Sequence, residues 1–271
     1  MTGHREPSGE CVGNCAYCDA RGVARREGSM PLCTRTESET VLRRTGIAGK
    51  GTIGPANGID PYDQAEGRCG DTLRRLEALL NEGSPVRVIT RSDRVLEDLP
   101  LLARIARRGS ATVLIAAATL DVELARVWEP KAIPPNERLS LLRRIREMGV
   151  SAGLMASPLV PFLMDDHTQL RSLLSAGRQA GAQYYCSDPS GWETELTLGR
   201  MRNLFAQRWP SLLDPLQRLY DGGNLPPQAY TDRIAGDIGR LAGEMGLADR
   251  SPASCSPGAL LASAFARHYG G

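Results

Sequence analysis

The sequence is poor in aromatic residues, has little net charge and contains no long apolar run. Aromatic residues make up only 5% of its 271 residues, so no stacking platform for single-stranded nucleic acid is evident. The 33 basic and 31 acidic residues leave a formal net charge of +2, which gives no broad basic surface for nucleic acid. No apolar run approaches the roughly 18 residues that a membrane-spanning helix needs. Residues 1–10 are polar and lack the apolar segment of a signal peptide, so we expect a cytoplasmic protein with no membrane partner.

Histidine is also scarce, and several familiar catalytic motifs are absent from the sequence. The three histidines, His4, His167 and His268, are far apart and form no H-E-x-x-H metal site. The sequence has no phosphate-binding P-loop, no G-x-S-x-G nucleophile turn and no G-x-G-x-x-G after a predicted strand. These absences argue against several common classes of hydrolase and dehydrogenase.

Short strands rich in Val and Ile alternate with amphipathic helices up to residue 186. The predicted strands are residues 51–53, 86–90, 111–117, 150–156 and 183–186, and the predicted helices between them are 71–80, 93–108, 122–127, 135–148 and 165–180. Alternation at this spacing is typical of β–α–β units with a parallel sheet. Residues 198–246 are instead predicted to be helical, with breaks near 222–227, and a tail begins at residue 249.

Three of the seven cysteines crowd into one predicted loop. Cys11, Cys15 and Cys18 follow the spacing C-x3-C-x2-C. Thiolates suit iron–sulfur clusters and zinc, but a structural zinc ion normally takes four ligands, typically in two separated pairs. Three thiolates can hold three corners of a four-iron cluster and leave one iron open for chemistry. A zinc-binding loop is the alternative.

This cysteine spacing, with Tyr17 before the last cysteine, resembles the radical S-adenosylmethionine superfamily. Further segments resemble its spore photoproduct lyase-like branch, whose members are often labelled DNA repair photolyases. These segments are Cys18-Asp19-Ala20-Arg21, Asn57-Gly58-Ile59-Asp60-Pro61-Tyr62 with Glu66, Val88-Ile89-Thr90-Arg91-Ser92, Ala118-Thr119-Leu120-Asp121, Trp128-Glu129-Pro130-Lys131-Ala132 and Ala156-Ser157-Pro158-Leu159-Val160-Pro161. The resemblance covers about residues 11 to 190, with a weaker helical similarity to about residue 245.

The resemblance implies an α/β fold, a partial (β/α)6 barrel with a helical C-terminal extension. It implies a radical S-adenosylmethionine core at residues 1–195, with the cluster loop at 8–35, and a helical extension and tail at 196–271. The implied cofactors are a [4Fe-4S] cluster on Cys11, Cys15 and Cys18 and S-adenosylmethionine on its open iron. A reductant such as flavodoxin or ferredoxin would trigger cleavage to a 5′-deoxyadenosyl radical, which abstracts hydrogen from a substrate that the sequence does not identify.

Polar side chains at the predicted strand ends are candidates for binding S-adenosylmethionine, because the carboxyl edge is the functional face of such barrels. They are Asp60, Ser92, Thr119 and Ser157. Tyr17 can lie near the adenine, and Arg138 can pair with the cofactor carboxylate through two hydrogen bonds. Structural alternatives are a turn at Asp60, helix N-caps at Ser92 and Thr119, and a solvated helix charge at Arg138.

Three features depart from the photolyase-like branch. Only ten residues precede Cys11, and they show no strand pattern, so either the first barrel strand is missing or the true start lies upstream. Spore photoproduct lyase has a cysteine hydrogen donor near the position of Asn57 and Gly58, which argues against repair of the thymine photoproduct by the same mechanism. Arg91 stands where lysine is usual, which keeps the charge but changes the geometry.

Cys186 follows two tyrosines at the end of the last predicted strand, at the barrel mouth. A thiol there could donate a hydrogen atom to a substrate radical, and a small buried core residue is the alternative. The resemblance suggests a nucleic acid partner, which the charge does not support. The alternative function is a non-catalytic protein that uses the same cysteines for zinc or a structural iron–sulfur cluster.

Overall fold

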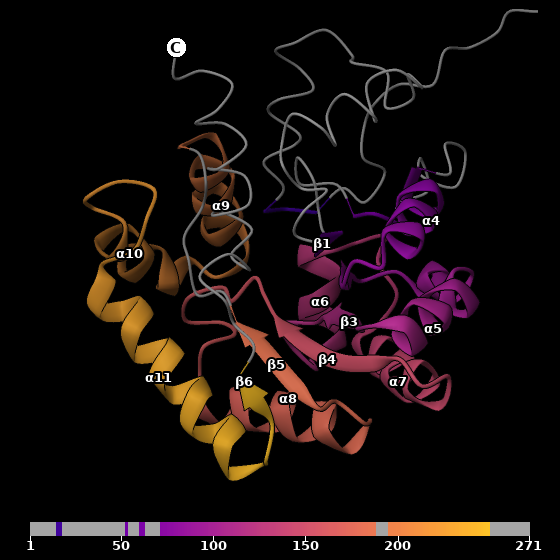
Figure 1. Cartoon of the computed structure of the whole chain (residues 1–271). Helices are drawn as coiled ribbons and strands as arrows, with labels where there is room; N and C mark the ends of the chain where they lie inside the picture. The colour runs from indigo at the N-terminus through magenta and orange to yellow at the C-terminus, as the bar shows by residue number, and fades with distance from the viewer. Residues whose placement is uncertain (1–14, 18–51, 54–59, 63–70, 188–194, 250–271) are drawn as a thin grey trace, which may run out of the picture.

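The computed structural model describes residues 15–17, 52–53, 60–62, 71–187 and 195–249, which form one parallel sheet with helices packed against it (Figure 1). The sheet has six strands in the order β1-β2-β3-β4-β5-β6, and every neighbouring pair is parallel. The strands are β1 (Thr52–Ile53), β2 (Val86–Thr90), β3 (Ala111–Ala116), β4 (Ser151–Ala156), β5 (Tyr184–Ser187) and β6 (Ala248–Asp249). The first five strands match those predicted from the sequence.

Helices connect consecutive strands and cover one face of the sheet. They are α4 (Asp71–Glu82), the 3-10 helix η2 (Asp93–Leu96), α5 (Leu99–Arg108), α6 (Val122–Trp128), α7 (Pro135–Glu147) and α8 (His167–Gln179). Helices α5, α7 and α8 pack against β3 and β4. Because all strands run the same way, the loops that follow them gather at one edge of the sheet, its carboxyl edge.

Side chains of the strands alternate between two apolar environments. On the face covered by helices, Val88, Val113 and Leu154 are completely buried in the main core. On the opposite face, which we call the inner face, a second small cluster consists of Ile89, Leu114, Met155, Tyr184 and Cys186. The sheet is therefore apolar on both faces, as expected for a parallel sheet in an α/β protein.

Gly153 allows close packing across the inner face. A Cβ atom at this position would lie 2.6 Å from Tyr184 Cδ2 and 2.7 Å from Leu114 Cδ2. Both neighbours come from adjacent strands in register with Gly153. No larger residue fits there without displacing them.

The single helix predicted over residues 93–108 is wrong. The segment divides into η2 and α5, with Asp98 between them as the N-cap of α5. Pro100 explains the division, because proline lacks a backbone N–H and is tolerated only in the first turn of a helix. A new helix must therefore begin just before Pro100.

The C-terminal segment is mostly helical, as predicted, and adds one strand. Its helices are α9 (Glu195–Arg208), α10 (Pro210–Leu219) and α11 (Gln228–Glu244), and β6 follows them and pairs with β5. The two residues of β6 carry no periodic signal, so the sequence did not predict it. Trp209 stacks on Trp128 of α6, with ring centroids 5.9 Å apart, and joins the extension to the sheet domain.

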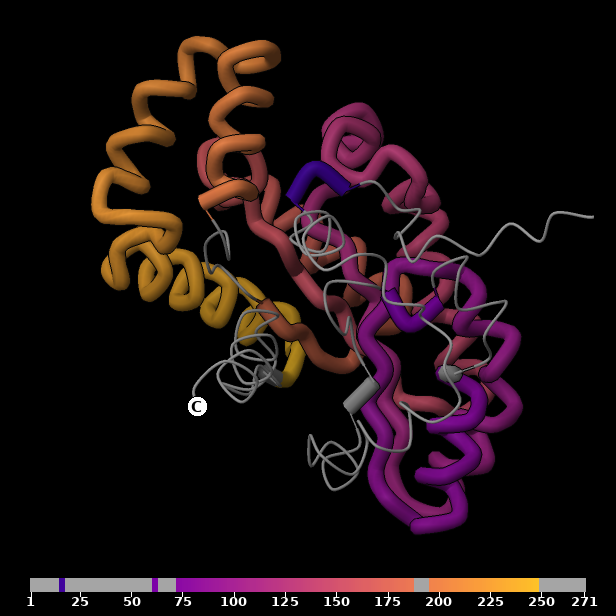
Figure 2. Tube along the Cα trace, turned by 90° about the horizontal axis from the view of Figure 1, so that it is seen from above, coloured from indigo at the N-terminus to yellow at the C-terminus, as the bar shows by residue number. Residues whose placement is uncertain are grey.

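Figure 2 shows the extension, coloured orange to yellow, at one end of the molecule and α4 and α5 at the opposite end. Within the described ranges, each helix is too short or too polar to cross a bilayer.

Candidate active site at the carboxyl edge of the sheet

The carboxylate of Asp60 fixes the carboxyl end of β2. Its Oδ1 accepts hydrogen bonds from the Thr90 hydroxyl at 2.5 Å and the Tyr62 amide at 2.9 Å. Its Oδ2 accepts from the Arg91 amide at 2.8 Å. Asp60 is buried, so these bonds replace the water that the carboxylate loses. The bond to Tyr62 confirms the expected turn, and the other two join that turn to β2.

Arg91, which directly follows β2, connects Asp60 to the cysteine loop. Its Nε lies 3.5 Å from Asp60 Oδ2, and its Nη1 lies 3.1 Å from the sulfur of Cys15. The same Nη1 lies 3.1 Å from Glu129 Oε1 and donates to the Tyr17 hydroxyl. The guanidinium carbon is 5.7 Å from the centroid of the Tyr17 ring. One side chain thus joins segments that are distant in the sequence.

The surroundings of Arg91 keep it charged. Burial by itself lowers the pKa of Arg91, but Tyr17, Cys15, Glu129 and Asp60 raise it, and the result lies well above the ordinary value. Arg91 is therefore a permanent positive charge beside the sulfur of Cys15.

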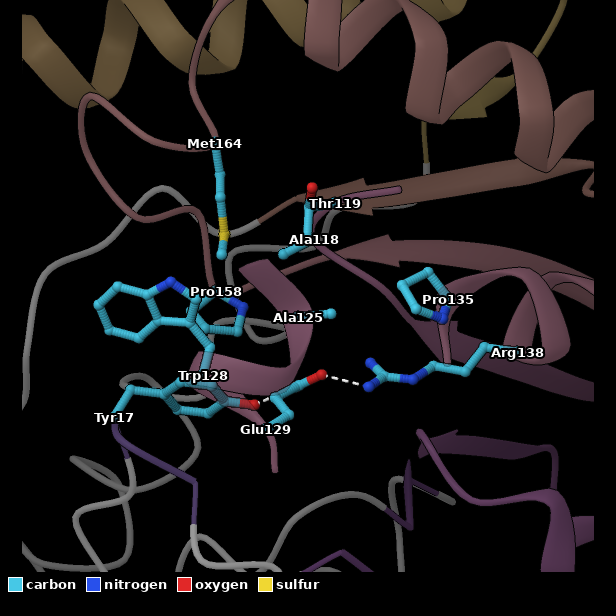
Figure 3. Close-up of a pocket in the computed structure, with 10 residues that line it drawn as sticks. All are labelled: Tyr17, Ala118, Thr119, Ala125, Trp128, Glu129, Pro135, Arg138, Pro158 and Met164. Carbon is cyan, nitrogen blue, oxygen red and sulfur yellow. Dashed lines mark hydrogen bonds and ion pairs between the residues drawn. The ribbon is translucent and has the colours of Figure 1, made fainter. Parts of the chain in front are cut away.

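Glu129 is shared by two arginines, of which Figure 3 draws Arg138. Its Oε1 accepts from Tyr17 and Arg91, and its Oε2 pairs with Arg138. Burial raises the pKa of Glu129, but Arg138 and then Arg91 lower it, and the result lies below the ordinary value of 4.5. Together with Asp60, the ionised Glu129 balances the two positive charges.

Arg138 is buried near the start of α7, with 2% of its surface exposed, so the solvated helix charge considered from the sequence is wrong. Its Nε donates to the Ile133 carbonyl at 2.7 Å and its Nη1 to the Ala116 carbonyl at 3.1 Å. Its Nη2 pairs with Glu129. These protein groups are the partners that the structure gives Arg138, and its contact with a cofactor carboxylate stays a prediction.

Tyr17 points into this ion network rather than away from it (Figure 3). Burial raises the pKa of Tyr17; Arg91 opposes this, but the net shift is well upward. The phenol is therefore protonated and donates to Glu129 while it accepts from Arg91. Its proposed position near the adenine stays a prediction.

A small pocket lies beside the network, between α6, α7 and the loops after β3 and β4 (Figure 3). Its lining includes Thr119, Trp128, Glu129, Arg138 and Met164. The cavity of about 10 Å³ has space for about one water molecule. The buried Trp128 Nε1 has no hydrogen-bond partner among the described residues, so such a water would satisfy it. The pocket is too small for S-adenosylmethionine.

Two of the other candidates form local backbone contacts. Ser92 is the N-cap of η2, because its Oγ accepts from the Arg94 amide at 3.3 Å. Thr119 is not the N-cap of α6, and that alternative is wrong. Asp121 caps the helix, and Thr119, two residues earlier, accepts at its Oγ1 a hydrogen bond from the Asp121 amide at 3.0 Å. Ser157 directly follows β4 and is half-buried.

The structure separates the cysteine candidates. Cys15 is buried and lies against Arg91. Cys186 is completely buried on the inner face, an environment that suits the core-residue alternative, and its role as hydrogen donor stays a prediction. Cys11 and Cys18 lie outside the described residues, as do Asn57 and Gly58.

The chemistry of the cysteine loop fits a metal cluster. A cationic neighbour favours the thiolate form of a cysteine, which is the form that ligates metals. No group of three potential ligands lies within the described ranges, because Cys15 is the one member of the triplet inside them. The donor set that a cluster would use is thus Cys11, Cys15 and Cys18, and the position of Cys15 at the carboxyl edge fits it.

Two central residues of this site, Arg91 and Glu129, were not among the sequence candidates. In the sequence Arg91 stands out only as a departure from lysine, and Glu129 only as part of a segment that resembles the photolyase-like branch. In the structure Glu129 is the C-cap of α6. A charged residue directly after a buried strand was the available signal for Arg91. Glu129 follows a helix, so no periodic pattern distinguishes it from a solvated charge.

No protein-family model matches the chain. An uncharacterized protein of Mycobacterium tuberculosis is 28% identical over 264 residues, which cover 90% of this chain and 74% of that protein. An uncharacterized protein of Acidianus two-tailed virus is 35% identical over 86 residues, which cover 32% of this chain and 28% of that protein.

Among solved structures, a point mutant of spore photoproduct lyase superposes with a TM-score of 0.60 at 14% identity, covering 88% of this chain and 73% of that one. Streptococcus suis SuiB bound to S-adenosylmethionine gives a TM-score of 0.46 at 15% identity, covering 77% of this chain and 44% of that one. The likeness to spore photoproduct lyase confirms the expected fold class, an α/β fold with a partial barrel.

Proposed function

We propose that the chain is a radical S-adenosylmethionine enzyme that binds a [4Fe-4S] cluster through Cys11, Cys15 and Cys18. The observation that carries this proposal is the position of Cys15. Its sulfur lies 3.1 Å from Arg91 at the carboxyl edge of a parallel sheet, the edge where barrels of this kind hold their active sites. A loop used only for structural metal binding has no need of this edge.

When bound, the cluster would pass one electron to S-adenosylmethionine, break its carbon–sulfur bond and supply a 5′-deoxyadenosyl radical that takes a hydrogen atom from the substrate. The electron comes from a reductant such as flavodoxin or ferredoxin. The substrate class is left open by the comparisons, and a nucleic acid finds no support in the net charge.

A series of contacts holds Cys15 and Tyr17 of the cysteine loop in place. Asp60 fixes the turn before α4 to β2, and Arg91 extends from the same strand to Cys15. Glu129 holds Tyr17, the residue between two of the cysteine ligands, while Arg138 holds Glu129. This chain of contacts positions Cys15 and Tyr17 before any cofactor binds, which lowers the entropy cost of assembling the site.

The polar groups at the ends of the strands are assigned to S-adenosylmethionine. Thr119 and Ser157 follow β3 and β4 at the carboxyl edge, where a hydroxyl can bind the ribose or the amino acid end of the cofactor. Ser92 is occupied as the cap of η2, so we assign it a structural role. Arg138 acts through Glu129.

Cys186 is assigned as the hydrogen donor to a substrate radical. It lies on the inner face beside Met155 and Tyr184, where a barrel would hold its substrate. Its S–H bond breaks, a C–H bond forms on the substrate, and the reductant restores the thiol with one electron and a proton. In D2O the exchanged thiol places one deuterium in the product, and a Cys186→Ala variant that still gives this deuterium overturns the assignment.

The test of the proposed function is cofactor cleavage by the anaerobically reconstituted chain. The protein is loaded with iron and sulfide, reduced with dithionite and mixed with S-adenosylmethionine, and 5′-deoxyadenosine is measured by mass spectrometry. Wild type forms it and Cys15→Ala does not. Cys255→Ala, a cysteine without partners at ligand spacing, is the matched control and retains the activity.

Two results contradict the proposal. A chain that takes up only zinc is the non-catalytic metal-binding protein considered above. A chain that binds a full four-iron cluster but does not cleave S-adenosylmethionine contradicts the proposed enzyme activity.

A further inference from the structure

The contact between Arg91 and Cys15 is additional to two ion pairs made by the same side chain. Asp60 and Glu129 alone would provide carboxylate partners for the Arg91 guanidinium. The Nη1 of Arg91 also lies 3.1 Å from the Cys15 sulfur. The site therefore brings a permanent cation to one of the three predicted cluster ligands.

The guanidinium is held rigidly in this position. Asp60 lies 3.5 Å from its Nε, and Glu129 lies 3.1 Å from its Nη1. The Tyr17 ring lies against the same group. With 17% of its side chain exposed, Arg91 has little solvent to screen its charge from the sulfur.

Glu129 compensates the charge of Arg91 only in part. Its second carboxylate oxygen pairs with the buried Arg138, so one negative charge is divided between two arginines. Nη1 of Arg91 contacts both Glu129 and the Cys15 sulfur, while Asp60 lies at Nε, so the guanidinium touches the sulfur directly.

We propose that Arg91 is a positioning residue that raises the reduction potential of the cluster through its contact with the Cys15 sulfur. This inference rests on the proposed function. Reduction adds one electron to the cluster, and a cation beside a ligand sulfur stabilises the more negative, reduced form. Hydrogen bonds to the sulfurs and local charge are known determinants of such potentials.

An arginine suits this position better than a lysine, because it can contact Asp60 and Cys15 at the same time. A guanidinium carries separate nitrogens, so Arg91 binds Asp60 with Nε and reaches Cys15 with Nη1. A lysine has one compact ammonium and must choose between the two groups. Arg91→Lys therefore keeps the charge but places it less closely against the sulfur.

The test is a potentiometric titration of the reconstituted chain, without S-adenosylmethionine, in which the reduced cluster is measured by electron paramagnetic resonance. At the wild-type midpoint potential, Arg91→Gln shows about a tenfold lower ratio of reduced to oxidised cluster, which is about 59 mV for one electron. Arg91→Lys lies between the two. Arg126→Gln, an exposed arginine that pairs with Glu123 at 2.6 Å, is the matched control and keeps the wild-type ratio.

The outcomes are separable by measuring iron and sulfide in every variant. An Arg91→Gln protein with a full cluster and the wild-type ratio overturns the inference. If Arg91→Gln does not bind a four-iron cluster, Arg91→Met is measured in its place. If neither neutral variant binds a cluster while Arg91→Lys does, Arg91 is needed for cluster assembly and the inference is overturned. A wild-type chain that binds no four-iron cluster overturns the proposed function. If the wild type cleaves S-adenosylmethionine but the Arg91 variants have the same cluster reduction potential as the wild type, only this inference is overturned.

Discussion

Two groups of charged side chains join distant segments of the chain, and they differ in the burial of their arginines. The first, around Arg91 and Glu129, lies at the carboxyl edge near β2 and is buried. The second is at the end of the loop after β4, where Tyr230 of α11 donates to Asp165 Oδ2 at 2.7 Å. Arg233 lies 3.9 Å from the same oxygen, and 55% of its side chain is exposed.

The difference shows which contacts the molecule depends on. Solvent can replace Arg233 as a partner of Asp165, so that ion pair contributes little to stability. Arg91 and Arg138 expose only 17% and 2% of their side chains, so solvent cannot replace Glu129 as their partner. The buried group holds Cys15 and Tyr17, and the exposed group contacts α11.

The largest effect is expected from removing the central charge of the buried group. Glu129→Gln leaves the buried Arg138 without a carboxylate and Arg91 with Asp60 alone, and should lower the free energy of unfolding by about 3–5 kcal/mol. Urea unfolding followed by circular dichroism measures it. Glu123→Gln, whose side chain is 80% exposed on the neighbouring helix, is the control and should change stability by less than about 0.5 kcal/mol. Equal effects of the two variants would contradict the comparison.

The Glu129 carboxylate also predicts a pH dependence of the unfolding free energy. The pKa of Glu129 is lowered in the folded protein, so its contribution is fully present above the ordinary value of 4.5 and is lost as the pH falls through the folded pKa. The difference in unfolding free energy between wild type and Glu129→Gln should therefore narrow when urea unfolding is repeated below pH 4.5. A difference that stays constant or widens on acidification would disprove this.

A smaller effect is expected in the second group. Tyr230→Phe removes the hydroxyl that donates to Asp165 and should cost about 0.5–1.5 kcal/mol, the usual contribution of one such bond. Thermal unfolding checks it. A loss as large as that of Glu129→Gln would mean that both groups are equally important to the fold.

The smallest effect is expected from the exposed ion pair. Arg233→Gln should change the free energy of unfolding by less than about 0.5 kcal/mol, since solvent and salt already screen its contact with Asp165. Urea unfolding at low and high salt would measure it. A loss above 1 kcal/mol would show that Arg233 is effectively buried through its contact with the Tyr230 ring.

Much of the fold could be predicted because periodicity reports burial. Five strands and most helices were found from apolar spacing alone, and β6 was missed because two residues have no period. The division between η2 and α5 could have been found from Pro100, since the rule for proline in helices is local. The buried position of Arg138 could not have been predicted, because an arginine on a helix is usually exposed to solvent.

The sequence by itself determined the parallel α/β order of the elements and the cysteine spacing, since both are carried by residues close together in the chain. The tertiary structure decided which charges meet. Cys15, Asp60, Arg91 and Glu129 come from separate segments, and the parallel sheet places the segments at one edge. Ion pairs between distant segments have no local signature, because a charge shows in the sequence but its partner does not.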